Sequence, residues 1–498
     1  MARTVQPVLA LLLAVILLMA GSGPLGTVVS VRLGETDAST LVIGLVMAAN
    51  FLGLTLGALF AFHVVTRVGH VRAFAAFAAI MAAATLAYPL VVDEPLWALY
   101  RLTQGFCAAG LFVCIESWLN DSATPENRGT ILAVYMTCLY FAQGGGQFVL
   151  TVPDESGYLI FSLIAFVIIL AVLPVATTPR APPMILNVAS LSFKRLWVAS
   201  PLGIFGCAAS GVMLGAIYGL APIYASGLGL DLSQTATLMS AIIFGGVLLQ
   251  WPLGRLSDRY DRRLVIVGTM AAGVVVSFLM LPTPALGLWA MVVVGALYGG
   301  IGFVIYPLCV AHTNDHLERE ERVSASGGLV LTYSAGATVG PPIAAAVMGE
   351  IGPSGLFVFS GVVGIVSVAF ATWRLRARAP VPADQQMPFR TLPRTTPVAS
   401  PLDPRGEDHV DTRQTVSHAH AAETMEAIEA AAVQAEQAEF LELQGEFDFG
   451  EPEEPPTEEP PTEETPTEEP AAEAEAVEGA PADAGVPAQE PSRERADA

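Results

Sequence analysis

Charged residues are scarce in this chain. They make up only 14% of its 498 residues, whereas 53% are hydrophobic. An ordinary soluble protein has about 25% charged residues, so this composition excludes a typical soluble domain of the same size. Cysteine is rare as well, with Cys107, Cys114, Cys138, Cys207 and Cys309 scattered through apolar stretches. That scatter does not fit the spacing of a metal site and does not indicate a disulfide framework.

Signatures of catalysis are also missing. The sequence has no nucleophile–base spacing, no phosphate-binding Walker motif and no cluster of metal-ligating residues. We therefore expect a protein that is not an enzyme, that does not use ATP as its energy source, and that needs no metal or cofactor. We also expect no nucleic-acid partner.

Negative charge is confined to the C-terminal part of the chain. Residues 380–498 contain 29 acidic residues and 6 arginines, whereas the preceding 379 residues contain 17 acidic and 18 basic ones. Low hydrophobicity combined with high charge is typical of disordered segments. We predict a disordered acidic tail over residues 379–498. The part before it is nearly neutral.

Long apolar runs fill that first part. Most contain about 20 apolar residues, the length needed to cross a hydrocarbon core about 30 Å thick. The first run could be mistaken for a secretory signal peptide, but its removal would leave an odd number of spans and break an internal repeat. We expect an all-α membrane protein with twelve spans near residues 7–30, 40–62, 71–92, 96–118, 130–152, 157–176, 202–224, 234–254, 264–282, 285–311, 326–348 and 355–374.

The longest internal connection separates six spans from six. The sequence therefore predicts an N-terminal six-helix bundle (1–178), a central loop (179–200) and a C-terminal six-helix bundle (201–378). With the N-terminus in the cytoplasm, 16 of the 18 basic residues before residue 380 fall on the cytoplasmic side. The positive-inside rule thus predicts that both termini, the central loop and the acidic tail are cytoplasmic.

A densely charged turn joins the eighth and ninth spans. It contains Gly254, Asp258, Arg259, Arg262 and Arg263, and a weaker copy around Arg67 lies 192 residues earlier. The turn resembles the loop signature of the major facilitator superfamily, Gly-x-x-x-Asp-Arg-x-Gly-Arg-Arg, with Asp261 in place of the second glycine. The resemblance implies two pseudo-symmetric bundles that alternate between two facing states. It also implies that Asp258, with Arg259, Arg262 and Arg263, latches the bundles in one state.

The fourth span carries an arginine near its start. Arg101 and Gln104 share one helix face with Gly105 and Ala108, and the run is similar to a second facilitator signature, Arg-x-x-Gln-Gly-x-x-x-Ala. A charged residue inside a span is costly, which favours a position facing a cavity. The alternative is an interfacial arginine that extends its side chain to the outer headgroups.

Glu116 is the only carboxylate within a predicted span. A carboxylate embedded in a membrane is a candidate proton carrier, because burial disfavours its charged form. The alternative is an acid at the inner interface, paired with a loop arginine such as Arg128.

Further polar and small residues lie inside the spans. Asn50, Gln143 and Gln147 could line a polar cavity or form interhelical hydrogen bonds. Small residues permit close helix approach and proline bends a helix. By this argument the candidates for packing and bending are Gly144, Gly336, Gly340 and Pro341; the last three resemble the Gly-Pro motif of facilitator antiporters.

Together these features predict a secondary active transporter in the cell inner membrane. We expect it to move a small solute by alternating access as a monomer within the lipid bilayer, coupled to protons or to an exchanged solute. The competing hypothesis is a receptor or scaffold of the same fold that does not transport and signals through its acidic tail.

Overall fold

The computed structural model describes residues 8–124, 126–178, 192–377, 381–382 and 386–403. Over these residues it contains helices and no strand, as the sequence predicts. The predicted disordered tail falls mostly on residues 404–498, which lie outside the described part.

The N-terminal helices follow the predicted spans closely. They are α2 (Leu9–Gly34), α3 (Thr40–Val68), α4 (His70–Ala87), η2 (Tyr88–Leu90), α5 (Glu94–Ser122), α6 (Arg128–Gly146), η3 (Gln147–Thr151), α7 (Leu159–Leu170) and α8 (Val172–Ala176). Short side chains define some of their starts. Ser39 caps α3 by accepting a hydrogen bond from the Val42 backbone N–H, and Asp93 caps α5 in the same way through Leu96.

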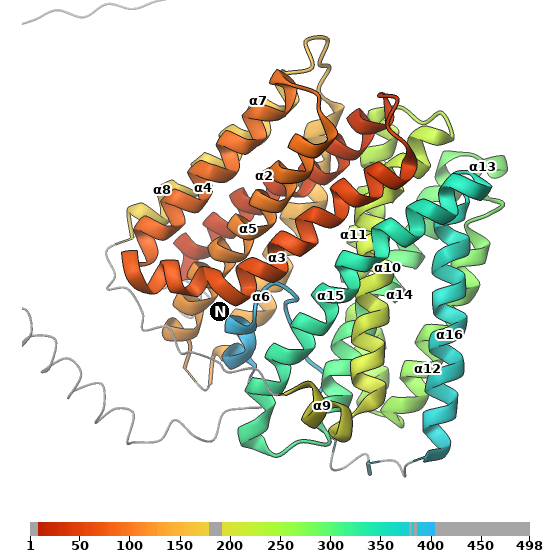
Figure 1. The fold of residues 1–498 in the computed structure, drawn as a ribbon. Helices are drawn as coiled ribbons and strands as arrows, with labels where there is room; N and C mark the ends of the chain where they lie inside the picture. Colours follow the sequence, from red (N-terminus) through yellow and green to blue (C-terminus); the bar gives the residue numbers. More distant parts are fainter. Residues whose placement is uncertain (1–7, 125, 179–191, 378–380, 383–385, 404–498) are drawn as a thin grey trace, which may run out of the picture. The chain divides into compact units, whose positions relative to one another are not determined.

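The C-terminal helices begin with a short connecting helix. They are α9 (Phe193–Ala199), α10 (Pro201–Gly227), α11 (Leu232–Ser257), α12 (Arg262–Leu279), α13 (Thr283–Leu286), α14 (Leu288–Asn314), α15 (Arg319–Ile351) and α16 (Gly355–Ala377). A last 3₁₀ helix, η5 (Pro397–Leu402), follows beyond the predicted spans. Figure 1 shows the N-terminal helices in red to orange on one side and the C-terminal helices in yellow to cyan on the other.

Eleven helices in the described part are long and apolar enough to cross a membrane. The predicted fifth span, 130–152, corresponds to α6 and η3, which are not among those eleven. Gln143, Gln147 and the run Gly144–Gly146 make this stretch less apolar than its neighbours. In hydrocarbon a helix satisfies its backbone internally, so polar side chains here must find partners in other helices.

The same helix pairings occur in both halves. α2 packs on α6 as α10 packs on α15, α3 on α5 as α11 on α14, and α4 on α7 as α12 on α16. Glycines allow the closest of these contacts. A Cβ on Gly53 would collide with the backbone of Leu102 in α5, and one on Gly340 would collide with Val212 in α10. The internal repeat predicted from sequence is thus present in the packing.

Candidate functional site

A cavity of about 200 Å³ lies between the N-terminal and C-terminal helices. Residues of α2, α3, α4, α5 and α6 line one side of it, and residues of α10, α11 and α15 line the other. Four predicted cavity residues are in the lining: Asn50, Arg101, Gln104 and Gln143. Small-molecule pockets typically measure about 300–1,000 Å³, so this one is small in the structure as it stands.

Arg101 and Gln104 are both buried in the wall of this cavity. Arg101 is 6% exposed, and its Nε has no hydrogen-bond partner among the described residues. Gln104 accepts a hydrogen bond of 2.9 Å from the Tyr88 hydroxyl and donates one of 3.2 Å to Thr85 Oγ1. These bonds hold the amide in a fixed orientation next to an arginine that retains donor capacity.

Gln147 does not line this cavity, although the sequence places it on the same face as Gln143. It accepts a hydrogen bond from Thr27 Oγ1 and donates one to the Gly23 carbonyl, each 2.9 Å long. The backbone changes from α to 3₁₀ geometry at this residue, and the side chain turns toward α2. Both its oxygen and its nitrogen are occupied by protein groups, which is the interhelical alternative considered above.

The helices close against each other at the end opposite the charged turn. Ser30 Oγ of α2 donates a 2.8 Å hydrogen bond to the Gly219 carbonyl of α10. Ser240 Oγ of α11 donates a 2.7 Å bond to the Gly144 carbonyl of α6. Both bonds join an N-terminal helix to a C-terminal one. Gly144 is therefore a contact between the two groups of helices, and Phe244 occupies the space a Cβ would need there.

Two other predicted packing residues act within the C-terminal helices. Gly336 and Gly340 of α15 lie against the backbone of Ala208 and Val212 in α10. Pro341 lies inside α15, and its carbonyl approaches Gly44 of α3 too closely for any side chain at that glycine.

The charged turn contains an ion-pair network within the C-terminal helices. Arg262 Nη1 lies 2.6 Å from Asp315 Oδ2, and both side chains are 1% exposed. Arg262 Nη2 lies 3.2 Å from Asp258 Oδ1. Burial raises the pKa of Asp315 above its ordinary value, although Arg262 and the Met387 backbone N–H act against this shift. Asp315 follows α14 and was not among the residues predicted from sequence.

Asp261 replaces a glycine of the family signature, and the backbone explains why this is tolerated. Its φ is −53°, whereas Gly69 at the matching place in the weaker copy has a φ of +86°. Asp261 caps α12 and pairs with Arg263 at 2.8 Å. Burial acts to raise the pKa of Asp261, but the hydrogen bonds from Arg263 outweigh it and keep this pKa below its ordinary value. Arg259 and Arg67 are exposed.

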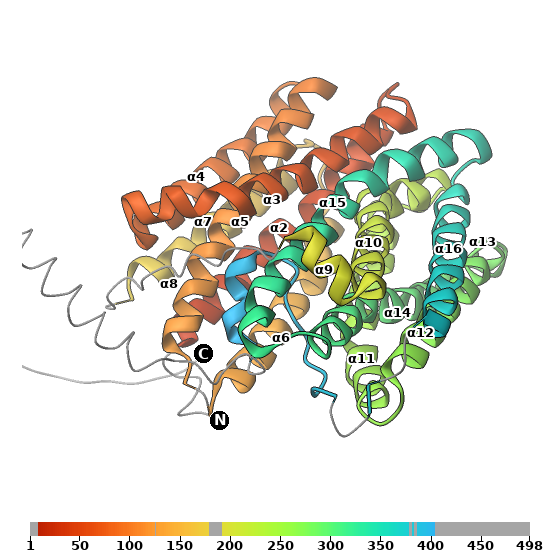
Figure 2. The same ribbon diagram turned by 60° about the horizontal axis from the view of Figure 1, so that its bottom comes forward.

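Residues 386–403, hereafter the C-terminal segment, fold back onto the charged-turn end. The sequence predicts a solvated tail from residue 379, but Leu392 and Leu402 are almost fully buried. η5 contacts α5, α6 and α15, and Figure 2 shows it in blue beside α6. Both sets of helices therefore hold this segment.

The charged turn binds the backbone of the C-terminal segment. Asp258 Oδ1 accepts a 2.7 Å hydrogen bond from the Phe389 N–H, and Asp315 Oδ1 accepts one of 2.9 Å from the Met387 N–H. Arg262 also donates to the Met387 carbonyl. The Phe389 ring occupies the space that any Cβ at Gly254 would need. Gly254, Asp258 and Arg262 of the signature therefore all contact the segment.

Glu116 is fully buried beneath the C-terminal segment. Its carboxylate accepts hydrogen bonds from the Tyr135 hydroxyl at 2.9 Å and from the hydroxyls of Thr395 and Thr396. Asn120, one turn further along α5, donates a 2.6 Å bond to the Val398 carbonyl. Glu116 is absent from the lining of the cavity between the helices, but Thr395 belongs to that lining.

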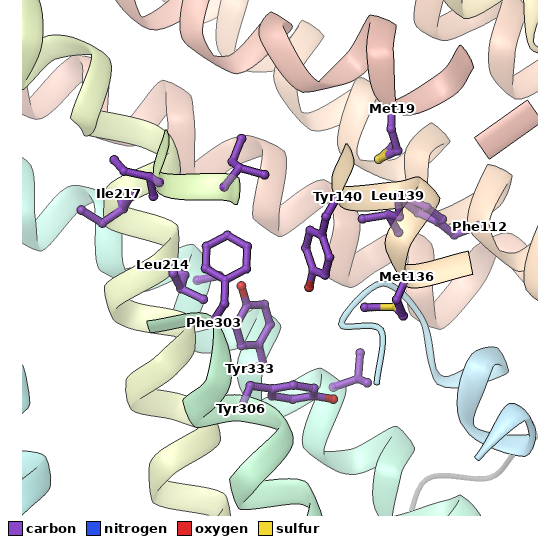
Figure 3. Packing of buried hydrophobic residues seen from close by; sticks show 14 of the residues in the cluster. Met19, Phe112, Met136, Leu139, Tyr140, Leu214, Ile217, Phe303, Tyr306 and Tyr333 are labelled. Atoms are coloured by element: carbon purple, nitrogen blue, oxygen red, sulfur yellow. The ribbon is translucent and has the colours of Figure 1, made fainter. Parts of the chain in front are cut away.

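Arg394 extends from the C-terminal segment into the cavity. Its guanidinium carbon lies 4.6 Å from the ring centre of Phe303, 5.3 Å from that of Tyr333 and 5.9 Å from that of Tyr140. Nη2 also donates a 2.7 Å hydrogen bond to the Tyr140 hydroxyl. Figure 3 shows these three rings close to one another, and Tyr140 meets Phe303 edge-on; we call the three residues the aromatic cage.

One sequence feature could have indicated this segment. Residues 385–402 contain no acid, although the stretch from residue 380 onward contains 29. Within them lie Arg390, Arg394 and several apolar residues. Such a stretch at the edge of an acidic tail is suited to pack against a membrane protein's buried carboxylates and aromatic rings.

Comparisons with known proteins agree with the fold. The family model described as Major Facilitator Superfamily matches residues 11–304 and 203–406. A protein of Salmonella enteritidis PT4 (strain P125109) named "Uncharacterized MFS-type transporter YcaD" is 30% identical over 374 residues, 74% of this chain and 95% of the relative. The protein of that name from Salmonella typhi is 31% identical over 369 residues, 73% of this chain and 94% of the relative.

Solved structures show the same architecture. A mutant of the nucleoside transporter NupG has a TM-score of 0.63 at 14% identity, over 74% of this chain and all of that one. A bacterial homologue of the human lysosomal transporter Spinster, inward-facing and occupied, has a TM-score of 0.58 at 16% identity, over 78% of this chain and 99% of that one. On its sequence match and its helical architecture, this multi-pass membrane protein belongs to the major facilitator superfamily of transporters.

Proposed function

We propose that the protein is a secondary active transporter that moves a small solute across the cell inner membrane by alternating access. The observation that carries this proposal is the cavity between the two groups of helices, whose mainly apolar lining includes the polar side chains of Arg101, Gln104, Asn50 and Gln143. Hydrogen bonds from Ser30 and Ser240 join the two groups of helices at one end, and the C-terminal segment contributes Pro393, Arg394 and Thr395 to the lining. We propose that residues 1–178 and 201–378 form the two bundles that rock about this cavity.

The lining residues divide into proposed roles. Arg101 and Gln104 would hold a polar group of the solute, with Asn50 and Gln143 as further hydrogen-bond partners. Glu116 would carry the coupled proton, since a buried carboxylate surrounded by hydroxyl groups can exchange one when the C-terminal segment moves. Exchange of a second solute is the other coupling mode consistent with the Gly340-Pro341 motif.

Orientation in the membrane follows from the basic residues. We propose that the charged turn, α9 and both termini face the cytoplasm, because the arginines concentrate at that end. The structure then corresponds to a state closed toward the outside.

We propose that the protein works as a monomer, with lipid around the helices.

Replacing Arg101 with alanine should weaken solute binding about 10- to 100-fold. Its loss would remove a charge-assisted hydrogen bond worth about 1.5–3 kcal/mol from a buried site. A thermal-shift screen of the full-length protein against amino acids, sugars, organic acids, nucleosides and amphipathic drugs would identify the solute, and titration would give both affinities. Arg67→Ala, at an exposed arginine, is the matched control. If well-folded protein responds to nothing in the panel, the receptor hypothesis gains over the transporter proposal.

Asp258→Asn should shift the balance between facing states toward closure at the opposite end. The change removes the charge that holds Arg262 and the Phe389 N–H, and so loosens the charged-turn end. Reporter cysteines at two buried sites, Val29→Cys and Leu132→Cys, would be labelled from either side after the native cysteines are replaced. Labelling rates that stay the same at both reporters would contradict a latch.

A further inference from the structure

The aromatic cage holds a positive charge without an acidic partner. Arg394 is 9% exposed, and no described carboxylate forms an ion pair with it. Its Nη1 is buried and has no hydrogen-bond partner among the described residues, so part of its donor capacity is unsatisfied. The Phe303 and Tyr333 rings and the Tyr140 hydroxyl supply the stabilisation instead.

This arrangement has the chemistry of a cation-binding site. The face of an aromatic ring carries negative charge density, and several faces around one point attract a guanidinium or ammonium group when water is excluded. The cage residues come from three helices, with Tyr140 on α6, Phe303 on α14 and Tyr333 on α15. Because α6 belongs to the N-terminal helices and the others to the C-terminal ones, an occupant of the cage contacts both groups.

Arg394, which occupies the cage, belongs to a segment that noncovalent contacts hold in place. The C-terminal segment is fixed through backbone bonds to Asp258 and Asp315 and through hydroxyl bonds to Glu116. None of the described contacts is covalent, and Pro393, Arg394 and Thr395 of the segment lie in the lining of the cavity. A tethered group competes with a free ligand at a high effective concentration.

We propose that the cage of Tyr140, Phe303 and Tyr333 is a binding site for organic cations, and that Arg394 occupies it as a tethered competitor. This inference rests on the proposed transport function, because it names the class of solute for the same cavity. Release of the segment frees both the cage and the Glu116 carboxylate.

Arg101 narrows the class of cation. It lines the same cavity, and its charge repels a second positive group placed beside it. The solute therefore carries its cationic group at one end, in the cage, an uncharged polar group toward Arg101 and Gln104, and an apolar part toward Met136 and Leu139. Hexylguanidinium has the cationic group and the apolar part alone, so it probes the cage separately from Arg101, and hexylurea is a neutral compound of nearly the same shape.

Binding of hexylguanidinium to the full-length protein tests the proposal directly. We expect Arg394→Ala to bind this probe at least tenfold more tightly than the parent in calorimetric titration, because the competitor is gone. Arg390→Ala, at an exposed arginine on the same segment, should leave the parent affinity unchanged. Hexylurea and hexanoate should bind weakly to all three proteins.

A second pair of variants examines the cage itself. In the Arg394→Ala protein, Tyr333→Leu should remove most of the gained affinity, whereas Tyr333→Phe, which keeps the ring, should retain it. The proposal is overturned if Arg394→Ala gains no affinity over Arg390→Ala, or if hexylurea binds as tightly as hexylguanidinium. Should Arg394→Ala fail to fold, Arg394→Gln provides the same comparison with a longer polar side chain.

Uptake of the probe into proteoliposomes separates this proposal from the transport function. Tight binding by Arg394→Ala without uptake would support the cation site and count against transport. Uptake of some other solute from the screen, with no gain in hexylguanidinium binding, would support transport and overturn the cation site.

Discussion

Replacing Arg262 with leucine is expected to destabilise the folded protein by about 3–5 kcal/mol, the usual cost of removing one partner of a buried ion pair. Asp315 would remain 1% exposed with its charge uncompensated, while Asp258 and the Met387 carbonyl would each lose a donor. Unfolding in detergent, followed by helical circular dichroism against denaturant, would measure the change.

A control variant and a double variant complete the test of the buried ion pair. Arg259→Leu removes an exposed arginine three residues away and should change stability by less than about 1 kcal/mol. Adding Asp315→Asn to Arg262→Leu should recover part of the loss, because a neutral amide is less costly to bury than a carboxylate. Equal stabilities for Arg262→Leu and Arg259→Leu would show that the buried pair contributes nothing.

Glycine-to-alanine substitutions at two positions of α15 should have opposite effects. A Cβ at Gly340 would lie 2.9 Å from the carbonyl carbon of Val212 and 3.0 Å from its Cα, and this backbone cannot yield as a side chain could. We expect Gly340→Ala to cost about 1–3 kcal/mol by forcing α10 and α15 apart. Slower rocking of the bundles should accompany this loss, seen as a lower rate of labelling at the reporter cysteines.

Gly349, which also lies in α15, is the control position for Gly340. It is exposed, and no atom outside its own helix lies within 4 Å of the Cβ it would gain. Gly349→Ala should therefore stabilise the protein by up to about 1 kcal/mol through the higher helix propensity of alanine. A loss of stability at both positions would mean that close packing between α10 and α15 is not what requires glycine at residue 340.

Features that depend on local chain properties could be predicted from the sequence. The spans, their alternating direction and the repeat around Gly144 and Gly336 follow from the length of apolar runs and the spacing of small residues. Helical periodicity places Arg101 and Gln104 on one face, and the cost of burying charge together with the resemblance to the second facilitator signature favours a cavity over the interface. These features require no knowledge of which helix lies beside which.

Gln143 and Gln147 show where this reasoning stops. Helical spacing assigns both to one face, yet only Gln143 lines the cavity, because Thr27 and Gly23 of α2 satisfy both ends of the Gln147 amide.

The hydrogen-bond partners of Glu116 could not be predicted from the sequence either. Its hydroxyl donors at Thr395 and Thr396 lie about 280 residues away along the chain, in a stretch whose composition indicates a solvated tail.

The sequence alone determined that this is a twice-repeated helical membrane protein with a charged turn at one end, because hydrophobic length and charge placement act through solvation and need no partner. Only the tertiary structure decided that Asp315 pairs with Arg262 and that Tyr140, Phe303 and Tyr333 surround Arg394. Such sites form where separate helices and the C-terminal segment meet, and the Arg394–Tyr140 bond joins residues 254 positions apart. Contacts of that kind depend on the packing of the whole bundle, which local patterns do not encode.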